Sequence, residues 1–229
     1  MLETILSEPA LLFSLALTAK TCLVTLVLFL VAGPAAGFYL ARVRGTAPRI
    51  LGFVITIPLV FPPVALGYML LTALGRTSFA GGLLESFGLS LIFNEAAVAL
   101  AGFIAGLPLV VRPLQAAFSS PRLIELEEAA RIHGAGSLDV FLRVTLPLVR
   151  PSLAAALLLG CARVSGEVGI TMMLGGNISE RTNTLSLEIF NAVSRADFDA
   201  ANTLCLLLSL FAALMFLASE ALMRRKPKL

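Results

Sequence analysis

Residues 21–41 read TCLVTLVLFLVAGPAAGFYLA and contain no charged side chain. A helix rises 1.5 Å per residue, so about 20 apolar residues cross the roughly 30 Å of hydrocarbon in a bilayer. Residues 50–75 and 200–219 are two further charge-free runs of similar length. Over the whole chain, 58% of residues are hydrophobic and 14% are charged, against about 45–50% and about 25% in soluble domains. The sequence therefore predicts an all-α fold, a polytopic membrane helical bundle.

The order of apolar and polar segments predicts one transmembrane domain, residues 1–229, with about five core crossings. Residues 9–20 run into the first span, and one helix over residues 9–40 would be about 48 Å long. We therefore expect its early section to lie on the outer surface or to tilt strongly, with a bend at Gly33 and Pro34. The other expected spans are residues 50–74, residues 95–111 with an interruption at residues 106–108, residues 151–174 and residues 200–223.

The second expected span contains three prolines, Pro58, Pro62 and Pro63. Proline removes a backbone N–H group, and the carbonyl freed inside a membrane needs a neighbouring helix or a hydrated cavity. Two interpretations stay open for this span, a kinked packing helix and a segment that borders a transport path.

Basic residues are distributed unevenly between the two sides of the membrane. With the N-terminus outside and five crossings, only Arg76, Arg181 and Arg195 lie outside, whereas twelve basic residues lie in cytoplasmic segments. Such a bias marks the cytoplasmic side. The cytoplasmic set is Arg42, Arg44, Arg49, Arg112, Arg122, Arg131, Arg143, Arg150, Arg224, Arg225, Lys226 and Lys228. The C-terminal basic cluster is thus interpreted as a topology anchor and not as a nucleic-acid site.

The longest polar interval is residues 119–150, called the polar connector below, and the charge bias places it in the cytoplasm. Ser120 is expected to cap a helix whose first residue is Pro121. Gly134 is expected to end that helix, because glycine reaches the left-handed conformation at little steric cost. Ser137 is expected to cap a second helix that ends near Pro147. A folded connector of this length between spans predicts a cytoplasmic partner.

Motifs of enzymes are absent from the sequence. There is no phosphate-binding Gly-x-x-x-x-Gly-Lys-Ser/Thr loop, no His-Glu-x-x-His pair and no Gly-x-Ser-x-Gly turn. A single histidine, His133, cannot build a histidine-ligated metal site. We therefore expect no catalytic residue, no metal and no cofactor on this chain.

Arg163 and Glu167 are the two charged residues inside the expected fourth span. A charge in hydrocarbon is costly, so such residues face the bundle interior or water. Four positions apart on one helix face, they can form a pair. Either the pair neutralises itself and packs helices, or this face lines or gates a polar path. The small residues around it suit both interpretations: Gly160, Ser165, Gly166, Gly169 and Thr171.

The connector carries a specific spacing. Glu128-Ala129-Ala130, three residues, Gly134, nine residues, then Val144 to Pro147 resembles the EAA signature of permease subunits in bacterial ABC importers. The surrounding sequence narrows the resemblance to molybdate-type (molybdate/tungstate) permeases with the type I importer fold. Residues 58–67, PLVFPPVALG, resemble that family's second span, and residues 163–171, RVSGEVGIT, with residues 176–178 and 181–185 resemble its fourth span and outer loop. The similarity covers residues 9–223.

The resemblance implies a multi-pass protein of the bacterial inner membrane that acts in an ATP-driven oxyanion importer. It implies a homodimer of permeases, two cytoplasmic ATP-binding cassette subunits that carry ATP and magnesium, and an extracytoplasmic oxyanion-binding protein. Molybdate is the expected oxyanion. Tungstate and sulfate remain alternatives, because Val168 and Ile170 stand where relatives often have phenylalanine and alanine.

Three groups of site residues follow from the resemblance. The ATPase-coupling residues, within the polar connector, are Glu127, Glu128, Ala129, Ala130, Arg131, Gly134, Leu146 and Pro147. The residues of the translocation path or gate are Pro62, Pro63, Arg163, Ser165, Gly166, Glu167, Gly169 and Thr171. The outer loop, residues 175–199, contributes Gly176, Asn177 and Thr182. A stand-alone anion channel or secondary carrier is the rival hypothesis; it needs no ATPase and leaves the EAA spacing unexplained.

Overall fold

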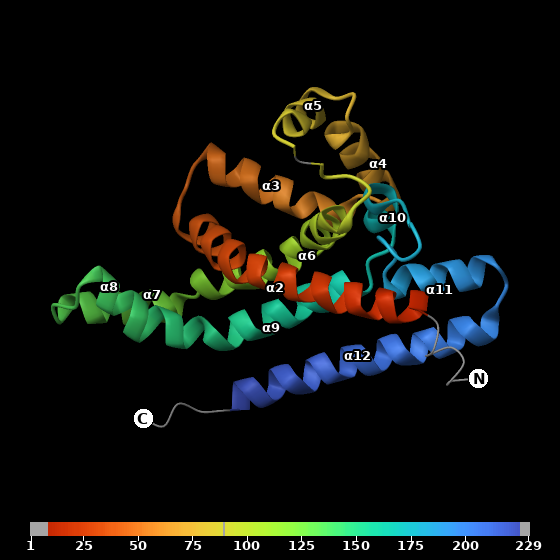
Figure 1. Ribbon diagram of the computed structural model, residues 1–229. Helices are drawn as coiled ribbons and strands as arrows, with labels where there is room; N and C mark the ends of the chain where they lie inside the picture. Colours follow the sequence, from red (N-terminus) through yellow and green to blue (C-terminus); the bar gives the residue numbers. More distant parts are fainter. Residues whose placement is uncertain (1–8, 89, 225–229) are drawn as a thin grey trace.

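The computed structural model describes residues 9–88 and 90–224, and every regular element among these residues is a helix (Figure 1). Three long helices form the centre: α2 (Pro9–Arg42), α6 (Glu95–Phe118) and α9 (Leu146–Ser165). Glycines permit the close approach of α6 and α9, since a Cβ atom on Gly106 would lie 2.9 Å from the carbonyl oxygen of Gly160. Buried Phe29 packs at the same place. The all-helical membrane fold is confirmed.

Four of the described helices are long and apolar enough to cross a membrane: Pro9–Arg42, Glu95–Phe118, Ser137–Ser165 and Phe198–Leu217. The second expected span is instead two shorter helices, α3 (Thr46–Val60) and α4 (Pro63–Leu74). Phe61 and Pro62 between them have extended backbone, with ψ of 143° and 129°. Pro62 and Pro63 thus break this span completely, which goes further than the expected kink.

The first helix, α2, is continuous for 34 residues and runs through Pro34. At 1.5 Å per residue it is about 51 Å long. Of the two expectations for residues 9–20, a segment on the outer surface or a strong tilt, the continuous helix favours the tilt. A helix of this length exceeds the hydrocarbon thickness, so it must tilt or extend beyond it.

Two expected helix boundaries are also wrong. The third span continues through Pro108 and Pro113 to Phe118 without interruption. The fourth begins well before Pro151: α8 (Ser137–Val140), a π-helical turn η1 (Phe141–Thr145) and α9 follow one another without a break. In this turn the N–H group of Leu146 donates to the carbonyl of Phe141, five residues back. Because a π-helical turn is wider than an α-helical one, it accommodates Pro147 where an ordinary helix would end.

The remaining helices lie around this centre. The polar connector, with α7 (Pro121–Ile132) and α8, lies at one end of α9, and α10 (Gly169–Gly175) and α11 (Leu185–Ser194) lie at the other (Figure 1). The short α5 (Phe79–Ser86) follows α4. The last helix, α12 (Phe198–Arg224), runs alongside the bundle and contacts α9 and α11. The basic residues after Arg224 lie outside the described residues.

Candidate functional site

The polar connector folds into the expected helix, glycine turn and second helix. Gly134 has a φ of +84°, and its N–H group donates to the carbonyl of Arg131 at 2.9 Å. The expected capping bonds are absent: neither Ser120 nor Ser137 accepts a backbone hydrogen bond through its side chain. Ser137 is already the first helical residue, after Gly136 at the N-cap position, so its hydroxyl is one position late for this role.

Glu127 holds the polar connector on the bundle. Its side chain is 4% exposed, and its Oε2 atom lies 2.8 Å from Nη2 of Arg42, at the end of α2. Its Oε1 atom accepts a hydrogen bond of 2.6 Å from the hydroxyl of Thr145 in η1. The guanidinium of Arg42 also lies 5.7 Å from the centre of the Phe38 ring. One carboxylate therefore joins α2, α7 and η1.

The other expected coupling residues are accessible to a partner. Ala130 is half-buried, and the rest are exposed: Glu128, Ala129, Arg131, Gly134, Leu146 and Pro147. Two apolar side chains beside them are strongly exposed, Ile132 at 83% and Leu138 at 71%. A cytoplasmic tip of α7 and α8 with exposed apolar and charged residues is suited to docking in a groove of another protein. Glu127 is the exception in this group because it points into the chain's own structure.

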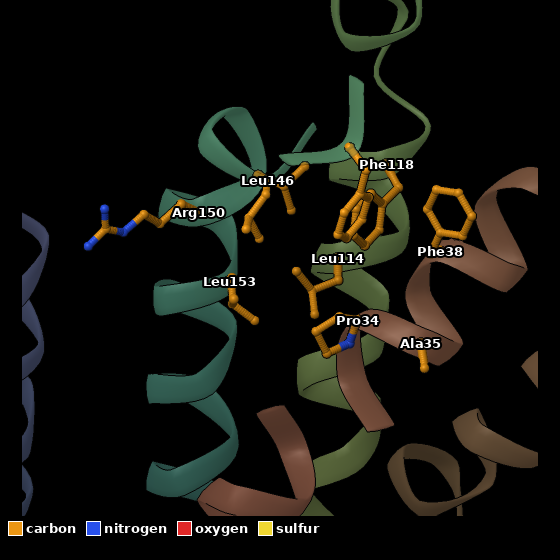
Figure 2. Close-up of a pocket in the computed structure, with 10 residues that line it drawn as sticks. Pro34, Ala35, Phe38, Leu114, Phe118, Leu146, Arg150 and Leu153 are labelled. Carbon is orange, nitrogen blue, oxygen red and sulfur yellow. The ribbon is translucent and has the colours of Figure 1, made fainter. Parts of the chain in front are cut away.

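An apolar cavity of about 230 Å³ lies behind the polar connector, between α2, α6 and the start of α9 (Figure 2). The rings of Phe38 and Phe118 meet edge to face there, with centres 5.4 Å apart. Arg150 lies at its rim, with its guanidinium directed away from the other labelled side chains (Figure 2). Since its lining is apolar, this cavity cannot solvate an oxyanion.

Arg163 and Glu167 form the expected ion pair, but not along one continuous helix. The helix α9 ends at Ser165, and Glu167 lies in the turn before α10. Glu167 is 1% exposed at its side chain, and its Oε1 atom accepts a hydrogen bond of 2.7 Å from the N–H group of Ile170. It therefore caps α10 and pairs with Arg163, whose side chain keeps 28% exposure.

The structure brings the expected path residues of the second and fourth spans into contact. A Cβ atom on Gly169 would lie 2.7 Å from the Cβ of Pro63 and 2.9 Å from the backbone nitrogen of Val64. Gly67 approaches Ile170 and Met173 equally closely. The starts of α4 and α10 are thus packed backbone to backbone. In this conformation Gly67 and Gly169 permit the close contact because they have no side chain.

Of the remaining path residues, Ser165 and Thr171 are buried and Gly166 is exposed. The hydroxyl of Ser165 donates to the carbonyl of Ala162 at 3.0 Å, and its own carbonyl accepts a hydrogen bond from the hydroxyl of Ser186. The exposed side of the break between α9 and α10 is therefore formed by Gly166 and some of Arg163, while Ser165 and Thr171 lie inside.

The outer loop is less external than expected. Residues 182–187 are buried, and the N–H group of Leu185 donates to the hydroxyl of Thr18 on α2 at 2.9 Å. Thr182 accepts a hydrogen bond of 2.9 Å from the N–H group of Ile178, and the amide of Asn177 donates to that of Asn191 at 2.7 Å. Gly176 ends α10 with a φ of +81°. The three predicted loop residues therefore stabilise the loop, and two of them, Gly176 and Asn177, keep partial exposure.

Sequence reasoning missed Arg42 and Thr145, the two partners of Glu127. Arg42 was interpreted only as one of the cytoplasmic charges, and Thr145 lies between the matched positions Val144 and Leu146. A buried carboxylate needs a cation, and the first arginine after a long apolar run was an available signal.

Comparisons with known proteins agree with this geometry. A family model described as "Binding-protein-dependent transport system inner membrane component" matches residues 33–225. The molybdenum transport system permease protein ModB of Azotobacter vinelandii is 38% identical over 203 residues, covering 88% of this chain and 89% of that protein. ModB of Mycobacterium tuberculosis is 39% identical over 218 residues, covering 95% and 81%.

More distant similarity extends to other transporters. Sulfate permease 2, chloroplastic, of Chlamydomonas reinhardtii is 35% identical over 206 residues, covering 90% of this chain and 56% of that protein. In a crystal structure of a bacterial alginate ABC transporter in complex with alginate pentasaccharide-bound periplasmic protein, one chain matches with a TM-score of 0.76 and 17% identity. The match covers 99% of this chain and 83% of that one, and it supports the fold alone.

Proposed function

Because the chain belongs to the family of binding-protein-dependent transport system inner membrane components, we propose that it is the permease subunit of an ATP-driven importer that carries molybdate across the inner membrane. The observation that carries the proposal is the exposed tip of the polar connector. There the EAA spacing from Glu128 to Pro147 coincides with a folded helix pair that has exposed charged and apolar side chains.

The proposed assembly contains two copies of this permease and two cytoplasmic ATP-binding cassette subunits. The chain's sequence contains no phosphate-binding loop, so the ATPase partner supplies ATP binding and magnesium. An extracytoplasmic binding protein delivers the oxyanion to the outer side. The tip of α7 and α8 docks in a groove of the ATPase, with Glu128 and Arg131 supplying charge and Ile132 supplying apolar contact.

Movement of the tip reaches the membrane through the continuous helix that begins at Ser137. That helix ends beside the break at Gly166, where Arg163 and Glu167 are paired. We place the gate at this break and at its contact with Pro63. Separation of α4 from α10 opens the polar path there, and Arg163 attracts the dianion while Glu167 keeps the attraction weak enough for release.

The ModB relatives support molybdate as the cargo, since they are named as molybdenum transport permeases. The similarity to a sulfate permease keeps the broader class, tetrahedral oxyanions, in view. Molybdate, tungstate and sulfate are all dianions of this shape, so the binding protein is expected to make most of the selection.

The test is reconstitution of the permease with its ATPase and binding protein in liposomes. We expect ATP-dependent uptake of labelled molybdate, competed by tungstate more strongly than by sulfate, and ATP hydrolysis stimulated by the loaded binding protein. Uptake of the same rate without the ATPase would overturn the proposal in favour of a channel or secondary carrier. Gly134→Asp is expected to abolish stimulated hydrolysis while leaving the protein folded.

A further inference from the structure

A second cavity lies away from the Arg163–Glu167 break. It has a volume of about 520 Å³ and lies between the end of α2, the start of α3 and the last third of α6. Three arginines line it: Arg44 and Arg49 from the α2–α3 connection and α3, and Arg112 from α6. The charge distribution along the sequence places it on the cytoplasmic side. Among the residues that the structure describes, no carboxylate lines this cavity.

Arg112 is fixed in position by neutral groups. Its Nη2 atom donates to the carbonyl of Gly52 at 2.7 Å, and its Nε atom donates to the hydroxyl of Thr56 at 3.1 Å. Its Nη1 atom donates to the side-chain oxygen of Gln115 at 2.8 Å. These bonds hold the guanidinium in place and leave its charge uncompensated, which is costly for a half-buried group in a membrane helix.

The other two arginines add to the same charge. Arg44 and Arg49 are exposed. Among the side chains described, those of residues 9–88 and 90–217, no carboxylate lies within ion-pair distance of Arg44, Arg49 or Arg112. Gly45 and Pro48 at the start of α3 line the cavity as well, and the start of a helix carries partial positive charge. Three arginines around one polar cavity form a site for an anion with several oxygen acceptors, since guanidinium groups match phosphate-like geometry.

We propose that this cavity binds one tetrahedral phosphate-type anion at the cytoplasmic face of the permease, held by Arg44, Arg49 and Arg112. The same chemistry occurs in a free inorganic oxyanion and in the headgroup of an anionic phospholipid. The site shares no residue with the proposed gate or with the exposed tip of the polar connector, so it stands independently of the transport proposal.

The test uses the full-length chain, its Arg44→Gln/Arg49→Gln double variant and the single variant Arg112→Gln. The double variant leaves the hydrogen bonds of Arg112 intact, so its fold is preserved even if Arg112→Gln does not fold. Arg150→Gln is the matched control, because Arg150 is an exposed cytoplasmic arginine outside this cavity. The first arm titrates delipidated protein with inorganic phosphate, sulfate and molybdate by calorimetry at constant ionic strength, with chloride as the blank.

The second arm measures lipid retention by native mass spectrometry after release from nanodiscs of phosphatidylglycerol or phosphatidylcholine. We expect the double variant to bind about tenfold more weakly or worse, since it loses two charge-assisted contacts, and the control to behave as wild type. A loss in the first arm alone identifies a free oxyanion as the ligand, and a loss in the second alone identifies a lipid headgroup. Losses in both mean that the site accepts either. Equal binding and retention by wild type and double variant would overturn the proposal.

Discussion

Glu127 and Glu167 are two buried glutamates at opposite ends of the Ser137–Ser165 helix, and their surroundings differ instructively. Each pairs with an arginine and accepts one further hydrogen bond. The partners of Glu167 lie within four residues of it, at Arg163 and Ile170. The partners of Glu127 are Arg42, from another helix of the bundle, and Thr145, eighteen positions along the chain.

The difference separates two mechanical roles. A local pair such as Arg163–Glu167 stabilises a break in the chain and can move with it as a unit. The Arg42–Glu127–Thr145 cluster instead joins three segments and resists any movement of one against the others. The polar connector is therefore firmly attached to the bundle through a carboxylate that joins three segments. At the α9–α10 break the ion pair is local, and the neighbouring segments contribute packing from α4 and α6 and one hydrogen bond from Ser186.

Glu127→Ala should have the largest effect on stability. It leaves the largely buried guanidinium of Arg42 without its anion, which lowers the free energy of unfolding by about 3 kcal/mol. Unfolding in detergent micelles with increasing sodium dodecyl sulfate measures it. Glu128→Ala is the control: its carboxylate is exposed, so stability should change by less than about 0.5 kcal/mol while ATP-driven uptake is lost. Equal stability of the two variants would refute the anchoring role of Glu127.

Gly169→Ala should have the next largest effect on stability. It should lower the free energy of unfolding by about 2 kcal/mol, because the added methyl group overlaps Pro63 and the backbone of Val64. Gly166→Ala is matched to it, since a Cβ atom there would meet only the carbonyl of Ala162 at 3.8 Å. The same unfolding assay should show near-wild-type stability for Gly166→Ala. If Gly169→Ala is as stable as the wild type, α4 and α10 separate without a cost in free energy.

Glu167→Gln keeps an oxygen for the N–H group of Ile170 but removes the anion facing Arg163. Because the side chain of Arg163 is partly hydrated, we expect the free energy of unfolding to fall by only about 1.5 kcal/mol. The double variant Arg163→Gln/Glu167→Gln should recover most of that stability, while molybdate uptake in the reconstituted importer stays low. Recovery of uptake together with stability would show that the pair only packs helices, the alternative that the sequence leaves open.

Thr145→Val should have the smallest effect, lowering the free energy of unfolding by about 1 kcal/mol. It removes one buried hydrogen bond to Glu127 but leaves the ion pair between Glu127 and Arg42. Thr145→Ser keeps the hydroxyl and should lie closer to wild type in the same unfolding assay. If valine is tolerated as well as serine, Arg42 alone anchors Glu127.

The features that follow from local chemistry could be predicted from sequence. Charge-free runs predict the membrane helices, and Gly134 predicts the left-handed turn of the polar connector. The ion pair of Arg163 and Glu167 also follows from their spacing. Each of these depends on residues that are near one another in the chain.

The features that depend on distant partners could not be predicted. From the sequence, Glu127 is interpreted as one more exposed acidic residue in a polar segment. Only the structure shows that it pairs with Arg42. Pro147 reads as a helix end, although the π-helical turn before it lets the helix continue. Residues 182–187 are predicted from sequence as part of an outer loop because their polar side chains suggest solvent. In the structure their hydrogen bonds go to Thr18, to the carbonyl of Ser165 and to other residues of the loop.

Because the helix from Ser137 to Ser165 is continuous, it can act as a lever between its two ends. Its 29 residues form a rod about 43 Å long. With one end at the exposed tip and the other at the break before Glu167, a tilt of about 5° at the tip displaces the far end by roughly 4 Å. That is about the size of one backbone contact such as the one between Gly169 and Pro63. A small rotation in the cytoplasm is thus geometrically sufficient to separate a pair of helices on the other side of the bilayer.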